Sequence, residues 1–302
     1  MIKPLLKFLP AVLLSFLTVT AFCQTGTLPG ADEKTKPDDK GDDATSSFKF
    51  GVSYLSNNVY MGRTDTATTP AIIPSVKYTF KFGLYFSGNL YYLPTKPTQK
   101  IDGGDLAAGY DGDISDDVSY GGSFTRYFFS STSTQIASAI KSTLNGNINW
   151  DNDYLSPALN VDYNLNVPGI HNDFLLSPAV AHDFIVVGVF GDVDIFLISP
   201  TVTLNAGTQN FYDSYVNKRK LKSARLTKIQ TALLAKYESQ LGQFEILDYE
   251  LSAPLEYKSG HFIFQLTPTY AIVQNQLPKQ LAAEFSAQTA VFFVEAGVSL
   301  KF

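Results

Sequence analysis

The sequence has one cysteine, Cys23, and, after its N-terminus, no apolar run long enough to form a transmembrane helix. A single cysteine excludes an internal disulfide and any site with several thiolate ligands. A helix needs about 18 or more continuous apolar residues to cross a bilayer, so no later segment is expected to span a membrane as a helix. Stability must therefore come from side-chain packing and backbone hydrogen bonds.

Basic residues are also few, with 23 Lys and Arg against 28 Asp and Glu. This acidic balance argues against nucleic-acid binding, which needs a basic surface. The three histidines, His171, His182 and His261, are too widely spaced to share one site. His171 with Asp173, two residues later, is the only candidate pair for hydrolase chemistry. Because phosphate-binding loops, metal-ligand spacings and catalytic signatures are absent, we expect no enzyme, no metal and no cofactor.

The N-terminus has the pattern of a secretory signal peptide. Two lysines precede an uncharged apolar stretch over residues 8–22, and cleavage is expected after Cys23, which gives a signal peptide over residues 1–23. Two alternatives remain: a membrane helix, for which the stretch is short and contains Pro10, and a lipoprotein acylated at Cys23, which bulky Phe22 fits poorly. Residues 24–47 follow as a charged leader that we expect to be disordered, because it has almost no large apolar side chain to bury.

The rest of the chain alternates strand-like runs and turns. The runs are rich in Val, Ile, Phe, Tyr and Thr, and clusters of Gly, Asn, Asp, Pro or Ser bound them. Most are near the roughly 9 to 11 residues that a tilted strand needs to cross a membrane. The twelve predicted strands are 48–60, 70–80, 83–93, 105–112, 117–130, 142–151, 156–166, 172–184, 193–206, 244–257, 261–274 and 289–302.

The lengths of the connections between these strands alternate along the chain. Those after even-numbered strands are short, whereas most of those after odd-numbered strands are longer, and the longest is the insertion 207–243. Short turns at one end and long loops at the other are typical of outer-membrane barrels, whose turns face the periplasm.

Most of the strands have one apolar and one polar face. In the last strand, Phe292 and its alternate neighbours are apolar, whereas Glu295 and Lys301 lie on the other side. The eighth strand has no consistent face, because His182 and Asp183 are adjacent polar residues. Aromatic residues at the turn ends predict a belt at the membrane interface. They are Phe48, Phe80, Trp150, Tyr257, Phe262 and Phe302.

We therefore predict an all-β fold, a transmembrane antiparallel β-barrel of about 12 strands over residues 48–302, in the outer membrane of a Gram-negative cell. The competing interpretation is a soluble β-sandwich or lipocalin-like barrel with the polar face outside. Strand length, loop pattern and aromatic ends favour the membrane barrel. Its expected partners are outer-membrane lipids, lipopolysaccharide and the barrel assembly machinery.

The first three strands resemble the opening of the TorF-type porins of bacterial outer membranes. That family opens with a strand that ends in an aromatic-x-Gly turn, followed by an x-Pro-Ala segment and a Gly-Leu-Tyr strand. The match covers about 35 of 302 residues and departs at Met61, where the family has Arg before the Gly. The resemblance implies location and architecture, and a fold alone does not settle a function. The matching residues are Ser56, Val59, Tyr60, Gly62, Pro70, Ala71, Tyr78, Gly83, Leu84, Tyr85 and Asn89.

The insertion 207–243 carries a run of basic residues. Leu226, Ile229, Leu233 and Tyr237 share one face at helical spacing, which predicts an amphipathic helix over about 219–241. The segment is either a solvated charged loop or a surface or lumen-plugging helix that binds lipopolysaccharide phosphates. The residues for the second interpretation are Lys218, Arg219, Lys220, Lys222, Arg225 and Lys228.

Two functions fit a barrel of this size. One is a narrow porin-like channel for small polar solutes or ions, and the other is a non-conducting structural or surface-interaction barrel whose loops bind a partner. Lumen-facing carboxylates at similar heights predict a weak preference for cations. Simple alternation aims Arg126 at lipid, but a bulge at Gly121 and Gly122 would turn it inward to pair with an acid. The lumen acids are Asp162, Asp248, Glu250 and Glu295.

Overall fold

The computed structural model describes residues 45–302 apart from 66–67, 192, 223–225 and 282–287. The predicted signal peptide and nearly all of the predicted leader lie outside the described residues. The helices are the 3-10 helix η1 (Ile136–Ala139), α1 (Asn210–Lys222) and α2 (Lys228–Glu238). The strands are β1 (Ser47–Leu55), β2 (Val59–Tyr60), β3 (Arg63–Thr64), β4 (Ala71–Thr79), β5 (Leu84–Tyr92), β6 (Ile101–Asp113), β7 (Val118–Phe129), β8 (Ile140–Trp150), β9 (Ser156–Asn166), β10 (Asp173–Ala181), β11 (Phe184–Val187), β12 (Ile195–Ile198), β13 (Thr201–Gly207), β14 (Glu245–Ser252), β15 (Leu255–Ser259), β16 (Phe262–Val273) and β17 (Ala290–Lys301).

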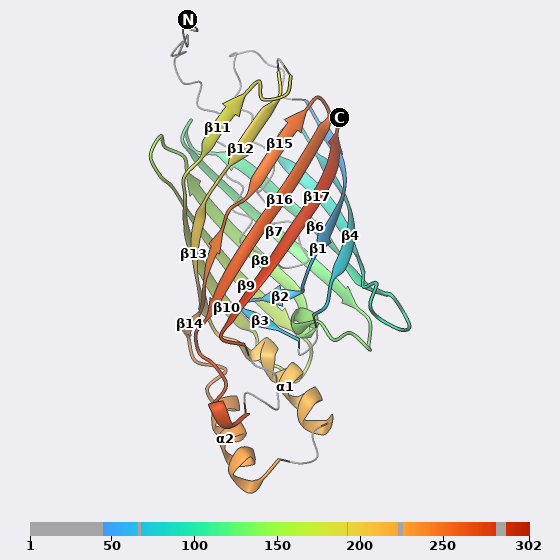
Figure 1. Cartoon of the computed structure of the whole chain (residues 1–302), viewed down its shortest axis with the longest axis vertical. Helices are drawn as coiled ribbons and strands as arrows, with labels where there is room; N and C mark the ends of the chain where they lie inside the picture. The colour runs from blue at the N-terminus through green and yellow to red at the C-terminus, as the bar shows by residue number, and fades with distance from the viewer. Residues whose placement is uncertain (1–44, 66–67, 192, 223–225, 282–287) are drawn as a thin grey trace, which may run out of the picture.

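The long strands form one closed antiparallel barrel. β1 pairs with β4 on one side and with β17 on the other, so the first and last long strands complete the wall (Figure 1). Three wall strands are each interrupted once and consist of β10 with β11, β12 with β13, and β14 with β15. Counted in this way the barrel has twelve strands, and the predicted fold class is confirmed. Closure pairs the backbone groups around the wall, which is the condition for β-structure to stand in lipid.

The three interruptions lie next to one another. The carbonyl of Pro200 accepts a hydrogen bond from His182 N–H at 3.2 Å, and the carbonyl of Pro254 accepts one from Ser199 N–H at 2.9 Å. Because proline has no backbone N–H, Pro200 and Pro254 each remove a donor from the ladder. The wall is therefore broken along one short line across three strands.

The interruption at residues 182–183 explains why the eighth predicted strand has no consistent apolar face. β10 ends before His182 and β11 begins after Asp183, so no single alternation runs through both side chains. The sequence pattern predicted the end of this strand at 184 and a turn over 185–192. That boundary is wrong, because β11 stays paired with β12 up to Val187.

The two faces of the wall differ as the sequence predicts. In β17, Phe292 is 63% exposed on the outside and Phe293 is 3% exposed on the inside. In β9, Tyr163 points outward, whereas Asp162 and Asn164 are buried. An exposed apolar surface that runs around the whole wall suits lipid rather than water. Its members include Val52, Val76, Phe86, Leu106, Phe124, Leu144, Val180, Val202, Leu251, Phe264 and Phe292.

Aromatic residues gather at the barrel end that carries the short turns. The ring of Phe80 lies 4.8 Å from that of Tyr78 and 5.4 Å from that of Phe82. Trp150 and Phe302 are more than half exposed. These rings occupy the position expected for an interfacial belt.

The long loops and both α-helices lie at the opposite end of the barrel (Figure 1). The sequence-based boundaries are wrong at two places there. The first strand ends at Leu55 rather than at residue 60, because β2 and β3 form a separate hairpin. The single helix expected over 219–241 is replaced by α1 and α2, and Ile229 is 72% exposed instead of sharing a buried face with Tyr237. None of the described helices is long and apolar enough to cross a membrane.

One carboxylate organises the turn between β11 and β12. Asp194 accepts hydrogen bonds from the N–H groups of Val189, Phe190 and Gly191 at 2.7, 2.8 and 2.9 Å, and from the Tyr257 hydroxyl at 2.8 Å. Burial by itself would raise the pKa of Asp194, but these hydrogen bonds outweigh it and hold the pKa below its usual value.

A lowered pKa makes this turn sensitive to acid. Asp194 stabilises the turn at pH values above its ordinary pKa, and the contribution is lost as the pH falls through the lowered one. Pepsin should therefore cut at the exposed Phe190 faster as the pH falls from about 4 to 2, after correction with an unfolded substrate. Asp194→Asn should be cut fast across this range. A wild-type profile as flat as that of the variant would contradict this role.

Candidate functional site: the lumen and its plug

A hairpin from the loop between β1 and β4 enters the barrel at the loop end. Its strands β2 and β3 are joined by Met61 and Gly62, whose φ angles of 48° and 68° are the positive values that a tight hairpin turn requires. Tyr60 is 1% exposed, its hydroxyl accepts a hydrogen bond from Asn164 Nδ2 at 2.7 Å, and its ring lies 4.6 Å from that of Phe211. The hairpin is therefore seated against the inner wall.

Other loops pack on this hairpin and form a small apolar core, which we call the plug. The plug joins the hairpin, η1, both α-helices and the loop between β16 and β17. These are the elements that gather at the loop end of the barrel in Figure 1. Packed apolar side chains exclude water, so the plug is a dry cluster at this end of the barrel. Its buried members are Tyr60, Met61, Ile136, Ala137, Ala139, Ile140, Leu175, Phe211, Tyr212, Tyr215, Val216, Leu234, Tyr237, Leu241, Leu247, Leu277 and Leu281.

Asp173 anchors α1 to the barrel wall. It is 0% exposed at the start of β10, and its carboxylate accepts hydrogen bonds from the N–H groups of Asn210 at 2.6 Å and Phe211 at 2.9 Å. Thr208 Oγ1 and Asn166 Nδ2 donate to the same carboxylate at 2.8 and 2.7 Å. A carboxylate at a helix N-terminus satisfies free N–H groups and interacts favourably with the helix dipole.

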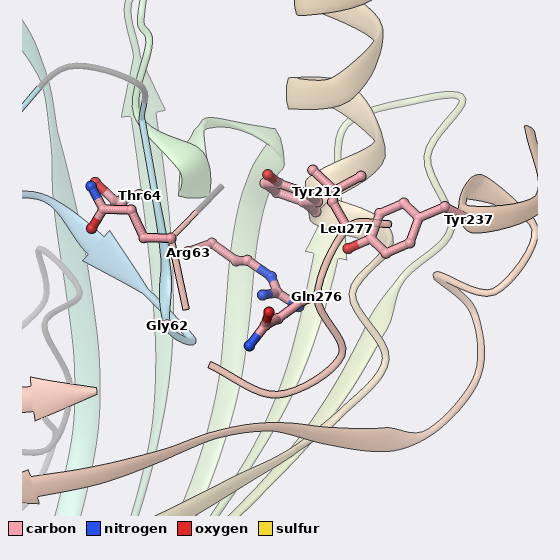
Figure 2. Close-up of a pocket in the computed structure, with 8 residues that line it drawn as sticks. Gly62, Arg63, Thr64, Tyr212, Tyr237, Gln276 and Leu277 are labelled. Atoms are coloured by element: carbon pink, nitrogen blue, oxygen red, sulfur yellow. The ribbon is translucent and has the colours of Figure 1, made fainter. Parts of the chain in front are cut away.

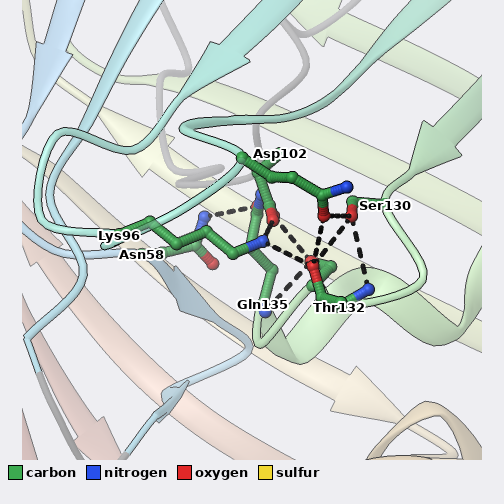
Figure 3. A network of polar contacts seen from close by, with 8 residues as sticks. Asn58, Lys96, Asp102, Ser130, Thr132 and Gln135 are labelled. Atoms are coloured by element: carbon green, nitrogen blue, oxygen red, sulfur yellow. Dashed lines mark hydrogen bonds and ion pairs between the residues drawn. The ribbon is translucent and has the colours of Figure 1, made fainter.

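A second buried carboxylate, Asp102, holds the loop that contains η1 (Figure 3). Lys96 Nζ, Ser133 Oγ and Gln135 Nε2 each donate to Asp102 at 2.6 Å. Gln135 Oε1 in turn accepts from Asn58 Nδ2 at 2.9 Å, which ties this loop to the hairpin. Because Asp102 is 0% exposed, these partners stabilise a charge that would otherwise be costly to bury.

Arg63, next to the hairpin turn, lines a small cavity of about 20 Å³ with Tyr212, Tyr237, Gln276 and Leu277 (Figure 2). Its guanidinium lies 5.6 Å from the centre of the Tyr212 ring. Burial raises the pKa of both tyrosines, so their hydroxyls stay neutral. A cavity of this size has room for about one water molecule.

Arg63 also fixes two loops to each other. Its Nη2 donates to Gln209 Oε1 at 3.0 Å and to the carbonyl of Asn275 at 2.6 Å. The hairpin, the start of α1 and the loop after β16 are thereby joined at one buried point, although they lie far apart in the sequence.

Three of the predicted lumen acids are buried on the inner face of the wall. Asp162, Asp248 and Glu250 are 7%, 0% and 3% exposed. Asn145 Nδ2 donates to Asp162 at 2.7 Å, and Asn205 Nδ2 donates to Asp248 at 2.6 Å. Such amide partners hold carboxylates in place in the lumen.

The fourth predicted acid, Glu295, stands opposite Leu55 and Thr267 in the ladder. Asp248 and Glu250 are neighbours on β14, two residues apart. Asp162 and Glu295 lie on β9 and β17, on other parts of the wall. The ring of acids and its part in ion selectivity stay predictions.

Sequence reasoning missed a fifth lumen acid, Asp105. It is 3% exposed on β6, accepts hydrogen bonds from Asn89 Nδ2 at 3.0 and 3.2 Å, and also accepts one from the Tyr91 hydroxyl. The signal was available, because Asn89 and Asp105 fall on strands whose alternation puts both inward.

The inward turn expected for Arg126 is wrong. The pairings of β7 with β6 and β8 contain no bulge at Gly121 or Gly122, so Arg126 stays in phase with the outward-facing Phe124 and Phe128. It donates a hydrogen bond to Ser142 on the neighbouring strand at 3.2 Å. A long basic side chain near the end of a wall strand can reach the polar membrane interface.

Lysines occupy the turn end of the lumen. Lys49 is directly opposite Lys301 on one side and Lys77 on the other, so the three lie in one row across β17, β1 and β4. Lys77 Nζ lies 3.8 Å from an Asp111 carboxylate oxygen and 3.8 Å from the centre of the Tyr85 ring. The lumen therefore has a basic row on one side of its turn end.

The basic insertion is placed only in part. Lys218, Arg219, Lys220 and Lys222 belong to α1, Lys228 is exposed at the start of α2, and Arg225 lies outside the described residues. Contact with lipopolysaccharide stays a prediction.

The three histidines lie in different places, and two of them contact different backbone carbonyls. His182 Nδ1 lies 2.6 Å from the Tyr154 carbonyl, and His261 Nδ1 lies 2.7 Å from the Lys301 carbonyl. His171 lies in the short loop before β10, beside the Asp173 that caps α1. The pair considered for hydrolase chemistry thus contains an acid whose hydrogen bonds hold a helix.

Comparisons with known proteins give only distant similarities. No family model matches the sequence, and no curated protein matches it significantly. The KdgM porin is 11% identical, with 85% of this chain and 99% of that chain covered and a TM-score of 0.46. The NanC porin is 12% identical, with 84% and 100% covered and a TM-score of 0.45.

The outer membrane protein OprD from Pseudomonas aeruginosa is 12% identical, with 87% of this chain and 66% of that chain covered and a TM-score of 0.36. Scores and identities this low carry no argument about this chain. Its barrel architecture rests on the strand register described above.

Proposed function

We propose that this chain is a porin-like barrel of the bacterial outer membrane, a narrow channel for small polar solutes or ions with a weak preference for cations. The plug closes its outer mouth and moves to let solutes pass. The observation that carries the proposal is the inner wall, where acids such as Asp105, Asp162 and Asp248 replace the apolar side chains of a dry core. Rings or clusters of carboxylates in a lumen favour cations.

The construction of the plug supports a closable mouth. Apart from Ile140, Leu175 and Leu247, which belong to the wall, the plug consists of loops, helices and the β2–β3 hairpin inserted between wall strands. Loop elements can move without breaking the wall, because their attachments are side-chain contacts such as those of Tyr60 and Asp173.

The second candidate is a non-conducting barrel whose outer loops bind a partner. The tight packing of the plug and the buried Asp102 network favour it, since both fix the loops in one arrangement. In this proposal the basic residues of α1 and α2 bind lipopolysaccharide phosphates.

Purified protein in a planar bilayer separates the two functions. Discrete conductance steps are expected for the channel, and their absence at high protein load, also after the plug is loosened, would favour the partner-binding barrel. Single-cysteine labelling on intact cells would place α2 outside or inside the outer membrane.

A double variant tests the predicted selectivity. Glu250→Gln with Glu295→Gln removes two lumen charges, so the reversal potential in a salt gradient should shift away from the cation side. The matched control is Asp116→Asn, which removes a charge from an exposed turn. An unchanged ion preference in a conducting double variant would show that these acids do not set it.

A further inference from the structure

Three buried oxygen atoms on the inner face of β13 and β14 have no hydrogen-bond partner. They are Asp248 Oδ2, Glu250 Oε2 and Thr203 Oγ1. Their residues are 0%, 3% and 1% exposed. Buried polar atoms are nearly always paired, because an unpaired one costs about 1–3 kcal/mol and more when it is charged. Three such atoms on one patch of wall are available to bind a ligand.

The ladder register brings these atoms together. Thr203 stands directly opposite Glu250, and Asn205 stands opposite Asp248. Asp248 and Glu250 are two residues apart on one strand, so their side chains project to the same side. The Thr203 hydroxyl belongs to the neighbouring strand β13 and lies on the same inner face of the wall as the two carboxylates.

The neighbouring polar groups donate no hydrogen bond to either free carboxylate oxygen, although the charge of Arg63 acts on Asp248. Asn205 Nδ2 donates to Asp248 Oδ1, the other oxygen of that carboxylate, and Ser177 Oγ donates to Asn205 Oδ1 at 2.7 Å. The hydrogen bonds of the nearby Arg63 go to Gln209 and Asn275. Two carboxylates thus lie side by side, each with one oxygen that no neighbouring N–H or hydroxyl group reaches.

We propose that Asp248, Glu250 and Thr203 form a binding site for a hard cation with oxygen ligands, of the Na⁺ or Ca²⁺ class. The inference rests on the proposed channel function, because it names the place where a conducted cation pauses. Carboxylate and hydroxyl oxygens are ligands that such cations prefer, and water completes their shell. Among the described residues no group of three or more His, Cys, Asp or Glu could hold a metal ion, so the proposed site has two carboxylates and one hydroxyl.

The hairpin of the plug covers this site. A Cβ placed on Gly62 would lie 2.8 Å from Asp248 Oδ2 and 3.0 Å from Asp248 Cβ, so the turn backbone rests directly on this acid. The positive φ of Gly62 and this contact both require glycine there. Movement of the plug and occupation of the cation site therefore involve the same carboxylate.

Calorimetric titration of the detergent-solubilised barrel with Ca²⁺, free of lipopolysaccharide, tests the site. One Ca²⁺ per chain should bind at low salt, and Asp248→Asn or Glu250→Gln should weaken binding by about tenfold or more, since each removes a charged ligand. The control is Glu256→Gln, because that buried carboxylate already has Lys258 Nζ at 3.1 Å and Gln265 Nε2 at 2.9 Å. Heat-resistant migration of each variant shows that it has folded.

The same titration in about 150 mM NaCl and in about 150 mM tetramethylammonium chloride assigns the ion class, because a larger loss of Ca²⁺ binding in NaCl indicates competition by Na⁺ rather than screening. The experiment is repeated in the Asp173→Ala background, where the plug is loosened and cannot block access. Absence of Ca²⁺ binding in both backgrounds, or Ca²⁺ binding as tight in the two acid variants as in the wild type, would overturn the site, and the carboxyl groups would then share a proton. Binding without conductance would leave the site standing and overturn the channel, because the titration needs no membrane.

Discussion

Asp173→Ala should open the outer mouth of the barrel. The substitution removes the acceptor for two N–H groups of α1 and for Thr208 and Asn166, all at 2.9 Å or less. Loss of a helix cap alone costs about 0.5–2 kcal/mol, and the buried donors left unpaired add to it. Because α1 supplies much of the plug, the variant should conduct several-fold more than the wild type in planar bilayers.

Two comparisons make this result specific. Asp153→Ala removes an exposed carboxylate from the turn between β8 and β9 and should leave conductance unchanged. Asp173→Asn keeps one acceptor oxygen and should lie between the wild type and the alanine variant. Wild-type conductance in a folded Asp173→Ala barrel would mean that this carboxylate does not hold the plug closed.

Leu266→Lys should prevent stable insertion, whereas Thr267→Lys should be tolerated. Leu266 is 42% exposed on the outer face of β16, four residues from the turn end, which places it roughly 10 Å above the aromatic belt and near the membrane midplane. A lysine there costs about 2–4 kcal/mol. Thr267 faces inward directly opposite Glu295, so a lysine at 267 meets an opposite charge.

The measurement is the fraction of heat-resistant barrel after refolding into lipid vesicles, followed by urea unfolding. Both variants change one side chain to lysine at adjacent positions, so each is the control for the other. Equal loss in the two variants would contradict the assignment of the outer face to lipid, and so would a greater loss for Thr267→Lys.

The strands of the wall could be predicted from the sequence because the patterns that define them lie within short segments. Alternation with a period of two fixes the face of residues such as Phe292 and Phe293 without knowledge of their partners. Turn residues and loop lengths likewise mark strand ends. All twelve strands were therefore predicted, with errors at ends such as that of β1 and at the interruptions of the wall strands.

The plug could not be predicted in this way because its contacts join residues that lie far apart in the sequence. Tyr60 meets Asn164 across 104 residues, and Arg63 meets Gln209 across 146. The one local signal is Tyr60-Met61-Gly62, the aromatic-x-Gly turn of the family resemblance, which forms the turn of the β2–β3 hairpin. Nothing in the pattern tells which way that turn folds.

The three strand interruptions form a line along which the barrel wall can bend, and we call this line the crease. Where Pro200 and Pro254 lie, the ladder has lost its donors, so bending there breaks fewer hydrogen bonds than bending elsewhere. Beyond the crease, β11 pairs only with β12 among the described residues. The three short strands β11, β12 and β15 thus form a small sheet that pairs with the rest of the wall through β16. This small sheet should bend outward as a unit more easily than any other part of the wall.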